Sequence, residues 1–206
     1  WHAEGETHIP VPVEGTTPRV LTRKKDIEQV HICLAFPGVE QDDEDLYPIS
    51  VMNNLFGGGM SSRLFQRIRE EMGAAYSVYS FPSTYTNCGT FTVYAGTSPE
   101  TAQQVADELL RQIRLLRDGG VTQEEFDMAK EQLKVSYVLG LESSSARMSA
   151  IGRSKLLRGH AVDPQDVIRK IEAVTKDDVE RVAHRMFSRP FSASAVGRNI
   201  DGLKLL

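Results

Sequence analysis

Arg69 and Tyr76 are the two residues of this chain whose types and spacing best suit binding chemistry. Apolar residues before Arg69 have the spacing of a short amphipathic helix, predicted over residues 61–72, and Gly73 is typical of a helix end. A segment rich in β-formers follows at once, so Tyr76 stands at the start of a strand predicted over residues 75–83. The guanidinium and the phenol are both hydrogen-bond donors. The sequence therefore predicts a donor pair across one tight corner, suited to carbonyl or carboxylate oxygens.

Both residues also have an ordinary structural explanation. A cation near a helix C-terminus complements the helix dipole, which accounts for Arg69 without any ligand. Tyrosine is common in strands, which accounts for Tyr76. The residues alone leave both explanations open.

Metal-binding motifs are not found in the sequence. Neither H-x-x-E-H nor H-E-x-x-H occurs. No two of the histidines have the spacing of a zinc site: His2, His8, His31, His160 and His184. Glu180 and His184 stand four apart on a predicted helix, and a surface pair is favoured over half of a metal site. We therefore expect this segment to bind no catalytic zinc.

The glycine run Gly57–Gly59 has two interpretations. A phosphate cradle is disfavoured because no strand precedes it and the Gly-Lys-Ser/Thr ending of a P-loop is absent. A helix end followed by a turn is favoured, with Ser61 or Ser62 capping the next helix. Close backbone approach to a partner domain is the remaining alternative.

Other charged residues near the corner predict no further site. Arg63 and Arg67 share the helix of Arg69 and are expected on a solvated face. The acids near the helix ends, Asp45 and Glu125 among them, are expected to be helix-terminal or surface acids, and no specific pair of catalytic carboxylates can be built from them.

Strand and helix signals along the chain favour an α+β fold, with an antiparallel or mixed sheet covered by helices on one face. Four strands are predicted: 26–36, 75–83, 89–97 and 190–197. Seven helices are predicted: 42–56, 61–72, 98–118, 122–140, 144–157, 163–173 and 175–187. Thr122 with Glu125 predicts a capping box at one helix start, and Thr175 with Asp178 predicts a cap at another. Pro48 is expected to delay the start of the first helix or to bend it.

Composition sets bounds on partners and compartment. The net charge of −4 argues against nucleic acid or an anionic membrane as the main partner, and no apolar run is long enough to span a bilayer. Cys33 and Cys88 are not in a C-x-x-C spacing, which favours a reducing compartment, and the start lacks a signal-peptide pattern. A cytoplasmic location is expected. The start at Trp1, without an initiator Met, suggests a piece of a longer chain.

The segment GGGMSSRLFQRIRE followed by MGAAYSVYS (residues 57–70 and 72–80) resembles the carboxy-terminal domain of the pitrilysin-type (M16) zinc metallopeptidases. This resemblance implies an interdomain linker over residues 1–25, which the Pro- and Gly-rich start also favours, and a carboxy-terminal, non-metal-binding domain over residues 26–206. It implies that Arg69 and Tyr76 donate hydrogen bonds to a substrate peptide near the scissile bond, and that Tyr76 helps to hold the oxyanion. Zinc would belong to an absent amino-terminal half.

The resemblance therefore implies the substrate-binding half of a zinc metalloendopeptidase that hydrolyses peptides or unfolded segments. This segment alone would be inactive. Its partners would be a peptide substrate and a zinc-bearing half or subunit, and a homodimer stays open. Two alternatives remain: a zinc-less scaffold like the core subunits of the cytochrome bc1 complex, and a peptide-binding module without proteolysis.

Overall fold

The computed structural model describes residue 13 and residues 17–206 of the chain. Five strands form one sheet: β1 (Val20–Lys24), β2 (Val30–Pro37), β3 (Ala75–Thr84), β4 (Gly89–Thr97) and β5 (Ser192–Gly197). Six α-helices accompany them: α1 (Leu46–Phe56), α2 (Ala102–Arg117), α3 (Gln123–Gly140), α4 (Ser144–Arg158), α5 (Pro164–Ala173) and α6 (Lys176–Phe187). A π-helix, η1 (Phe65–Glu71), lies between α1 and β3.

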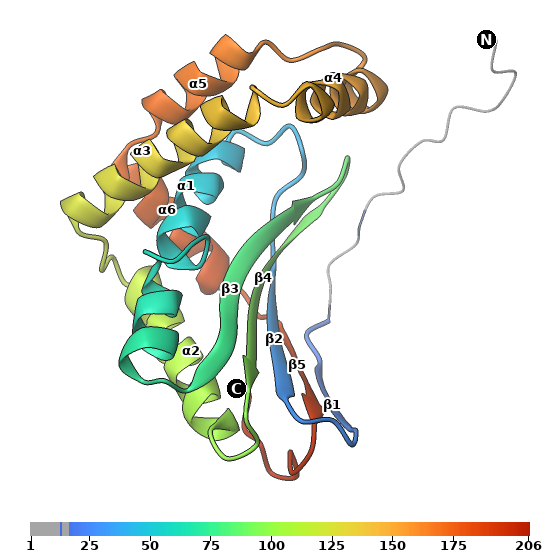
Figure 1. Cartoon of the computed structure of the whole chain (residues 1–206), viewed down its shortest axis with the longest axis vertical. Coiled ribbons are helices and arrows are strands. Elements are labelled where there is room, and N and C mark those ends of the chain that lie inside the picture. The colour runs from blue at the N-terminus through green and yellow to red at the C-terminus, as the bar shows by residue number, and fades with distance from the viewer. Residues whose placement is uncertain (1–12, 14–16) are drawn as a thin grey trace, which may run out of the picture.

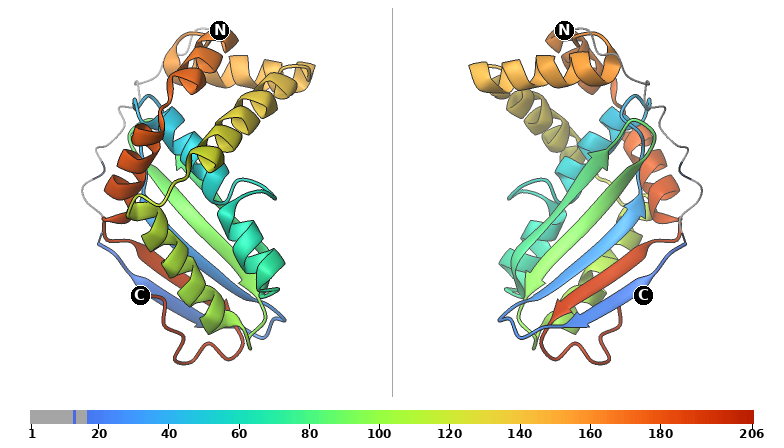
Figure 2. Two further views of the ribbon diagram at one scale, coloured as in Figure 1. Left: turned by 90° about the vertical axis from the view of Figure 1, so that its left-hand side faces the viewer. Right: turned by 90° about the vertical axis from the view of Figure 1, so that its right-hand side faces the viewer.

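The sheet is mixed, with the strand order β1-β5-β2-β4-β3. β1 runs parallel to β5, whereas the β5–β2, β2–β4 and β4–β3 pairs are antiparallel. The helices gather on one side of the sheet and leave its other face uncovered by the described elements (Figures 1 and 2). The predicted α+β class, with a mixed sheet covered on one face, is confirmed.

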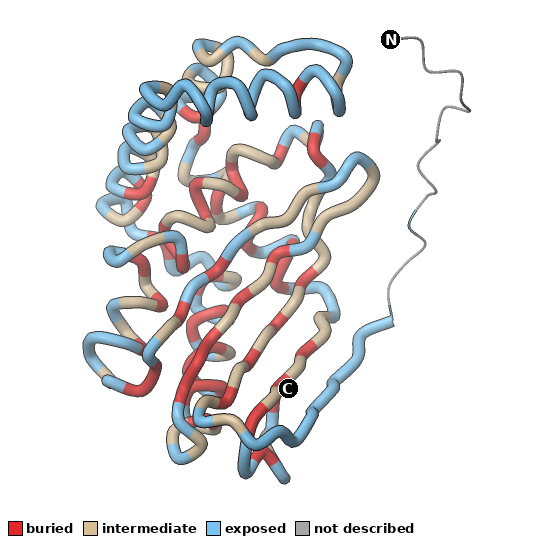
Figure 3. Tube along the Cα trace, turned by 45° about the vertical axis from the view of Figure 1, so that its right-hand side comes forward, coloured by how far each residue is buried: buried red, intermediate tan, exposed pale blue. Residues whose placement is uncertain are grey.

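Alternation along the strands decides which face carries the core. In β2 every second residue, from Val30 to Phe36, is fully or almost fully buried against the helices, while the residues between them are partly exposed (Figure 3). Phe187 at the end of α6 closes this core, with its ring centre 4.9 Å from that of Phe36 and 5.7 Å from that of Phe91. This period of two is the pattern from which the strand was predicted.

Helix ends follow the predicted capping signals in most places. Thr122 and Thr175 each form a capping box, with Glu125 and Asp178 respectively. The helix predicted from Ser98 begins later: α2 has Thr101 as its N-cap, with no side-chain cap hydrogen bond. The predicted helix 42–56 likewise begins at Leu46, which leaves its proline in the first turn, where no backbone donor is needed.

The strand β1 was not predicted. Val20–Lys24 falls inside the range 1–25 that was predicted as an interdomain linker, yet it pairs with β5 at the edge of the sheet. All five of its residues are exposed, so no apolar alternation marks it in the sequence. Residues 1–12 and 14–16 of that range lie outside the described residues, and the linker role stays a prediction.

In the described part of the chain, no helix combines the length and apolar character needed to cross a membrane.

Candidate functional site

Arg69 lies in the last turn of η1, where the sequence predicts the end of a helix. The turn is that of a π-helix, because the N–H of Met72 donates to the carbonyl of Arg67 over 3.2 Å, five residues back. Ile68 faces inward and is fully buried. Gly73 then turns the chain with a φ of +57°, a left-handed conformation that glycine adopts without strain. π-Helical turns are rare in proteins, and those that occur are often found at functional sites.

Tyr76 is placed by a β-bulge at the start of β3. Ala75 pairs with Thr97 and Ser77 pairs with Gly96, so Tyr76 is the extra residue on its strand. Bulges of this kind re-aim a side chain and often lie next to active sites. Tyr76 is 72% exposed, and β3 is an edge strand of the sheet.

The structure brings the two predicted site residues together. The guanidinium carbon of Arg69 lies 5.6 Å from the ring centre of Tyr76 and 4.9 Å from that of Phe65, both within cation–π range. Neither the Arg69 guanidinium nor the Tyr76 hydroxyl forms a hydrogen bond or ion pair with another described residue. Both groups therefore keep their donors for an acceptor from outside this part of the chain. What they bind stays a prediction.

Two threonines fix the corner between Arg69 and Tyr76. The hydroxyl of Thr97 donates to the carbonyl of Ala74 at 2.5 Å, and the hydroxyl of Thr101 donates to the same carbonyl at 3.1 Å. Thr97 is 2% exposed. Sequence reasoning missed both residues, because they stand more than 20 positions from the corner and carry no local signal of this contact.

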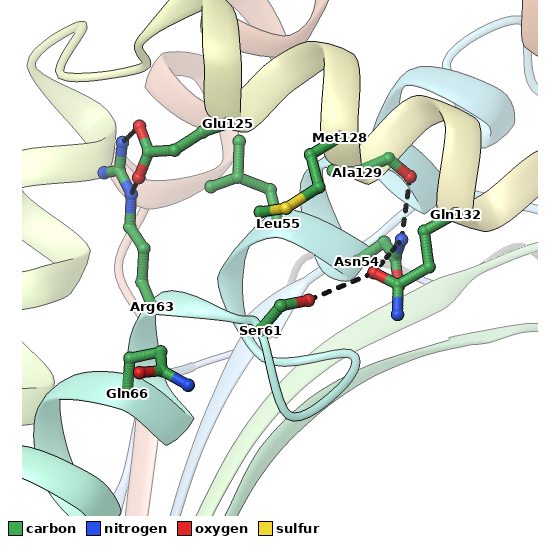
Figure 4. Close-up of a pocket in the computed structure, with 9 residues that line it drawn as sticks. All are labelled: Asn54, Leu55, Ser61, Arg63, Gln66, Glu125, Met128, Ala129 and Gln132. Atoms are coloured by element: carbon green, nitrogen blue, oxygen red, sulfur yellow. Dashed lines mark hydrogen bonds and ion pairs between the residues drawn. The ribbon is translucent and has the colours of Figure 1, made fainter.

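Arg63 was predicted on a solvated face, and this prediction is wrong. Its side chain is 13% exposed and forms a two-pronged ion pair with Glu125, at 2.6 and 2.7 Å (Figure 4). It also donates to the carbonyl of Gly120. Burial acts to raise the pKa of Glu125, but hydrogen bonds from Arg63 and Thr122 outweigh it and hold that pKa at about 2. The start of the helix that carries Arg69 is thus bound to the start of α3.

Arg67 is 42% exposed, in line with the prediction, but it is paired. It contacts Glu108 of α2 at 3.1 Å and Glu71 at 2.5 Å. Asp45 and Glu125 lie at helix ends, as expected, Asp45 as the N-cap of α1 and Glu125 as the third residue of α3. The Asp45 side chain is nevertheless only 1% exposed, and Arg181 and Arg185 contact it at 2.6 and 2.5 Å. These pairs join residues far apart in sequence, which no local pattern reveals.

The glycine run is a helix end followed by a turn, as was favoured. Gly57 is the C-cap of α1, and a Cβ at this position would lie 2.5 Å from the backbone nitrogen of Ser80. Neither predicted serine cap forms. Ser62 donates to the carbonyl of Gly59 at 2.5 Å, and Ser61 donates to the side chain of Gln132 at 3.2 Å.

A cavity of about 150 Å³ lies between α1, η1 and α3, beside the glycine run (Figure 4). Its polar walls bond to one another, since Asn54 donates to the carbonyl of Ala129 at 2.7 Å and Gln132 accepts from Ser61. These contacts tie the glycine run to α3. The nine lining residues are Asn54, Leu55, Ser61, Arg63, Gln66, Glu125, Met128, Ala129 and Gln132.

Residues 13 and 17–206 contain no group of three or more His, Cys, Asp or Glu side chains that could hold a metal ion. Glu180, which stands four residues before His184, accepts from Lys176 at 2.8 Å. The side chains in this part of the chain therefore do not fit a zinc ion. The groups that the corner offers to a ligand are the Arg69 guanidinium and the Tyr76 hydroxyl.

Solved structures define the class of this fold. A protease from Helicobacter pylori superposes with a TM-score of 0.80 at 22% identity, over 93% of this chain and 48% of that one. A peptidase M16 inactive domain from Pseudomonas fluorescens gives a TM-score of 0.79 at 22% identity, over 91% and 46% of the two chains. At such identities the likeness shows the fold alone: that of an M16 inactive domain.

Sequence comparison gives the family. The family described as the peptidase M16 inactive domain matches residues 3–133, and the chain belongs to the M16 peptidase family. A Bacillus subtilis protein named as an uncharacterized zinc protease is 40% identical over 176 residues, which is 85% of this chain and 43% of that protein. A protein of the same description from Streptomyces coelicolor is 42% identical over 82% of this chain and 37% of its own length. The chain thus spans about two fifths of the curated relatives it matches.

Proposed function

We propose that this chain is the substrate-binding half of a zinc metalloendopeptidase, with zinc held by a half or subunit outside it. The observation that carries the proposal is the corner at which Arg69 and Tyr76 stack while their donor groups have no partner within the described part of the chain. Membership of the M16 family and relatives named as zinc proteases support it. The substrate would be a peptide or an unfolded segment, since the donor pair suits backbone carbonyls.

In this role both side chains donate hydrogen bonds to the substrate peptide near the scissile bond, and Tyr76 also helps to hold the oxyanion. Arg69 presents a permanently charged fork of N–H donors, and its ring contacts restrict the orientation of that fork. Tyr76 presents a single hydroxyl from an exposed position. Donors fixed in advance at the place where negative charge develops lower the barrier, because little reorganisation is needed during reaction. Zinc in the partner half would supply the activated water when bound.

The scaffold alternative has one structural parallel, since a chain of complex III from Candida albicans superposes with a TM-score of 0.80 at 20% identity. A scaffold has no need of an exposed donor pair, so the presence of both Arg69 and Tyr76 favours the peptidase. The cytoplasmic location belongs to the same proposal and rests on cysteine usage alone.

Reconstitution tests the proposal. The chain is mixed with a zinc-bearing M16 half, and cleavage of a quenched fluorescent peptide is followed. We expect each half alone to be inactive and the mixture to cleave the peptide. Peptide binding by the mixture without cleavage would favour the binding module, and neither binding nor cleavage by a stable complex would favour the scaffold.

A further inference from the structure

Glu108 of α2 is a nearly buried carboxylate that takes no part in the proposed contacts to substrate. Its side chain is 10% exposed and contacts Arg67 of η1. It accepts from Arg67 at 3.1 Å, from Arg111 at 2.8 and 2.7 Å, and from Gln112 at 2.8 Å. Of these donors, Arg67 belongs to η1 and the other two to α2 itself. A single contact from this cluster therefore reaches the helix that carries Arg69.

Arg67 is also part of the turn that presents Arg69. Its carbonyl accepts the hydrogen bond from Met72 that closes η1, and the carbonyl of Ile68 accepts from Ala74 at 3.0 Å. Arg69 thus lies inside a turn bounded by two backbone bonds. The core holds this turn through the buried Ile68 side chain, and α2 holds it laterally through Arg67.

We propose that Glu108 is a positioning residue which, through Arg67, sets the orientation of the last turn of η1 and so the place of the Arg69 guanidinium. The proposal rests on the proposed function for the role of Arg69 toward substrate. Its physical basis is that, among residues 13 and 17–206, Arg69 has only ring contacts to hold its side chain, with Phe65 and Tyr76. Such contacts restrict where the guanidinium plane lies but do not fix the helix turn beneath it.

Arg111 provides a control for the contact between Arg67 and Glu108, although Arg67 alone also contacts Glu71 within η1, at 2.5 Å. Both arginines donate to the Glu108 carboxylate. The Arg111 side chain is 46% exposed and the Arg67 side chain is 42% exposed. Arg111 lies three residues after Glu108 on α2, so removing it disturbs the carboxylate without releasing η1. A structural role of the cluster predicts similar effects of Arg67→Met and Arg111→Met, whereas a positioning role predicts different ones.

The experiment measures kcat and KM for peptide cleavage in the intact, zinc-loaded peptidase. We expect Arg67→Met to lower kcat/KM by about ten- to a hundredfold, since small misplacements of catalytic groups have effects of this size. Arg111→Met should change it by less than about twofold, and Arg67→Lys should recover part of the loss, because a lysine keeps one charged contact. In an Arg69→Ala background, Arg67→Met should have almost no further effect.

Equal losses in Arg67→Met and Arg111→Met would overturn the proposal, and so would an undiminished effect of Arg67→Met in the Arg69→Ala background. A second readout does not depend on activity: the NMR shifts of the Arg69 side-chain protons, which the Phe65 and Tyr76 rings displace. Arg67→Met should move these shifts toward unstructured values, while Arg111→Met should leave them in place; unchanged shifts in both would also overturn it. If Arg69→Ala itself leaves cleavage unchanged, the proposed function fails, and the NMR shifts alone decide the positioning role.

Discussion

Gly57 and Gly59 differ sharply in what a methyl group would meet, although they stand two residues apart in one glycine run. A Cβ at Gly57 would lie 2.5 Å from both the backbone nitrogen and the hydroxyl oxygen of Ser80. A Cβ at Gly59 would meet nothing closer than the Gln132 side chain, at 3.6 Å. Gly57→Ala should therefore force α1 and β3 apart, whereas Gly59→Ala should fit without movement.

The size of the effect depends on which contacts must break. Ser80 is 4% exposed, its N–H donates to the Gly57 carbonyl at 3.1 Å, and its hydroxyl donates to Asn53 at 2.8 Å. Overpacking costs roughly 1–3 kcal/mol, and each lost hydrogen bond adds about 1 kcal/mol. Gly57→Ala should thus lower the free energy of unfolding by about 3–5 kcal/mol, which for a chain of this size is a fall in Tm of about 6–20 °C. Gly59→Ala should stay within about 0.5 kcal/mol of the parent.

Urea titration and calorimetry of the two variants beside the parent chain measure the difference. A Gly57→Ala protein with the Tm of the parent would refute the close approach of α1 to β3. A Gly59→Ala protein destabilised as much as Gly57→Ala would show that the whole run, rather than one tight contact, needs glycine.

Two further predictions concern the supports of the corner. Hydrogen bonds, from Arg111 foremost and from Gln112 and Arg67, hold the pKa of Glu108 at about 2. This pKa lies below the ordinary value of about 4.3 in the unfolded chain. The ionised Glu108 therefore stabilises the fold fully above about pH 4.5, and this stabilisation is lost as the pH falls toward 2. Glu108→Gln should therefore lower unfolding free energy at pH 7 by an amount on the order of 3 kcal/mol and match the parent near pH 2; a constant difference across urea titrations from pH 7 to 2 would contradict this. Thr97→Val removes one of two donors to the Ala74 carbonyl and should lower the free energy of unfolding by about 1 kcal/mol. Thr97→Ser keeps the hydroxyl and should restore this stability. Equal stability of the Val and Ser variants in guanidinium titrations would show that the hydroxyl is unimportant.

The parts of the fold that the sequence predicts are those with a local signal. The strand from Val30 to Phe36 shows its buried face by alternation, and the boxes at Thr122 and Thr175 mark helix starts through hydrogen bonds within four residues. β1 has no such signal, because it is exposed along its length and is defined by pairing with a strand about 170 residues later.

The candidate site divides in the same way. Arg69 and Tyr76 are seven residues apart, so one helix end and one strand start suffice to place them at a common corner. The groups that hold this corner come from elsewhere: Glu108 and Glu125 reach back 41 and 62 residues to their arginines. Their helices give no local reason to expect these arginines as partners, and for this reason the sequence alone places Arg63 on a solvated face and gives no arginine partner for Glu125.

The most direct test of the account compares Tyr76→Phe with Tyr79→Phe in a cleavage-competent assembly of this chain with its zinc-bearing half. Tyr79 lies three residues along the same strand and is 43% exposed, so it controls for the loss of any exposed phenol from β3. Loss of one donor to the developing oxyanion should lower kcat by about 10²- to 10³-fold in Tyr76→Phe, while Tyr79→Phe should retain nearly full activity. Undiminished kcat in Tyr76→Phe, or equal losses in both variants, would contradict the assignment of the corner as the substrate-binding site.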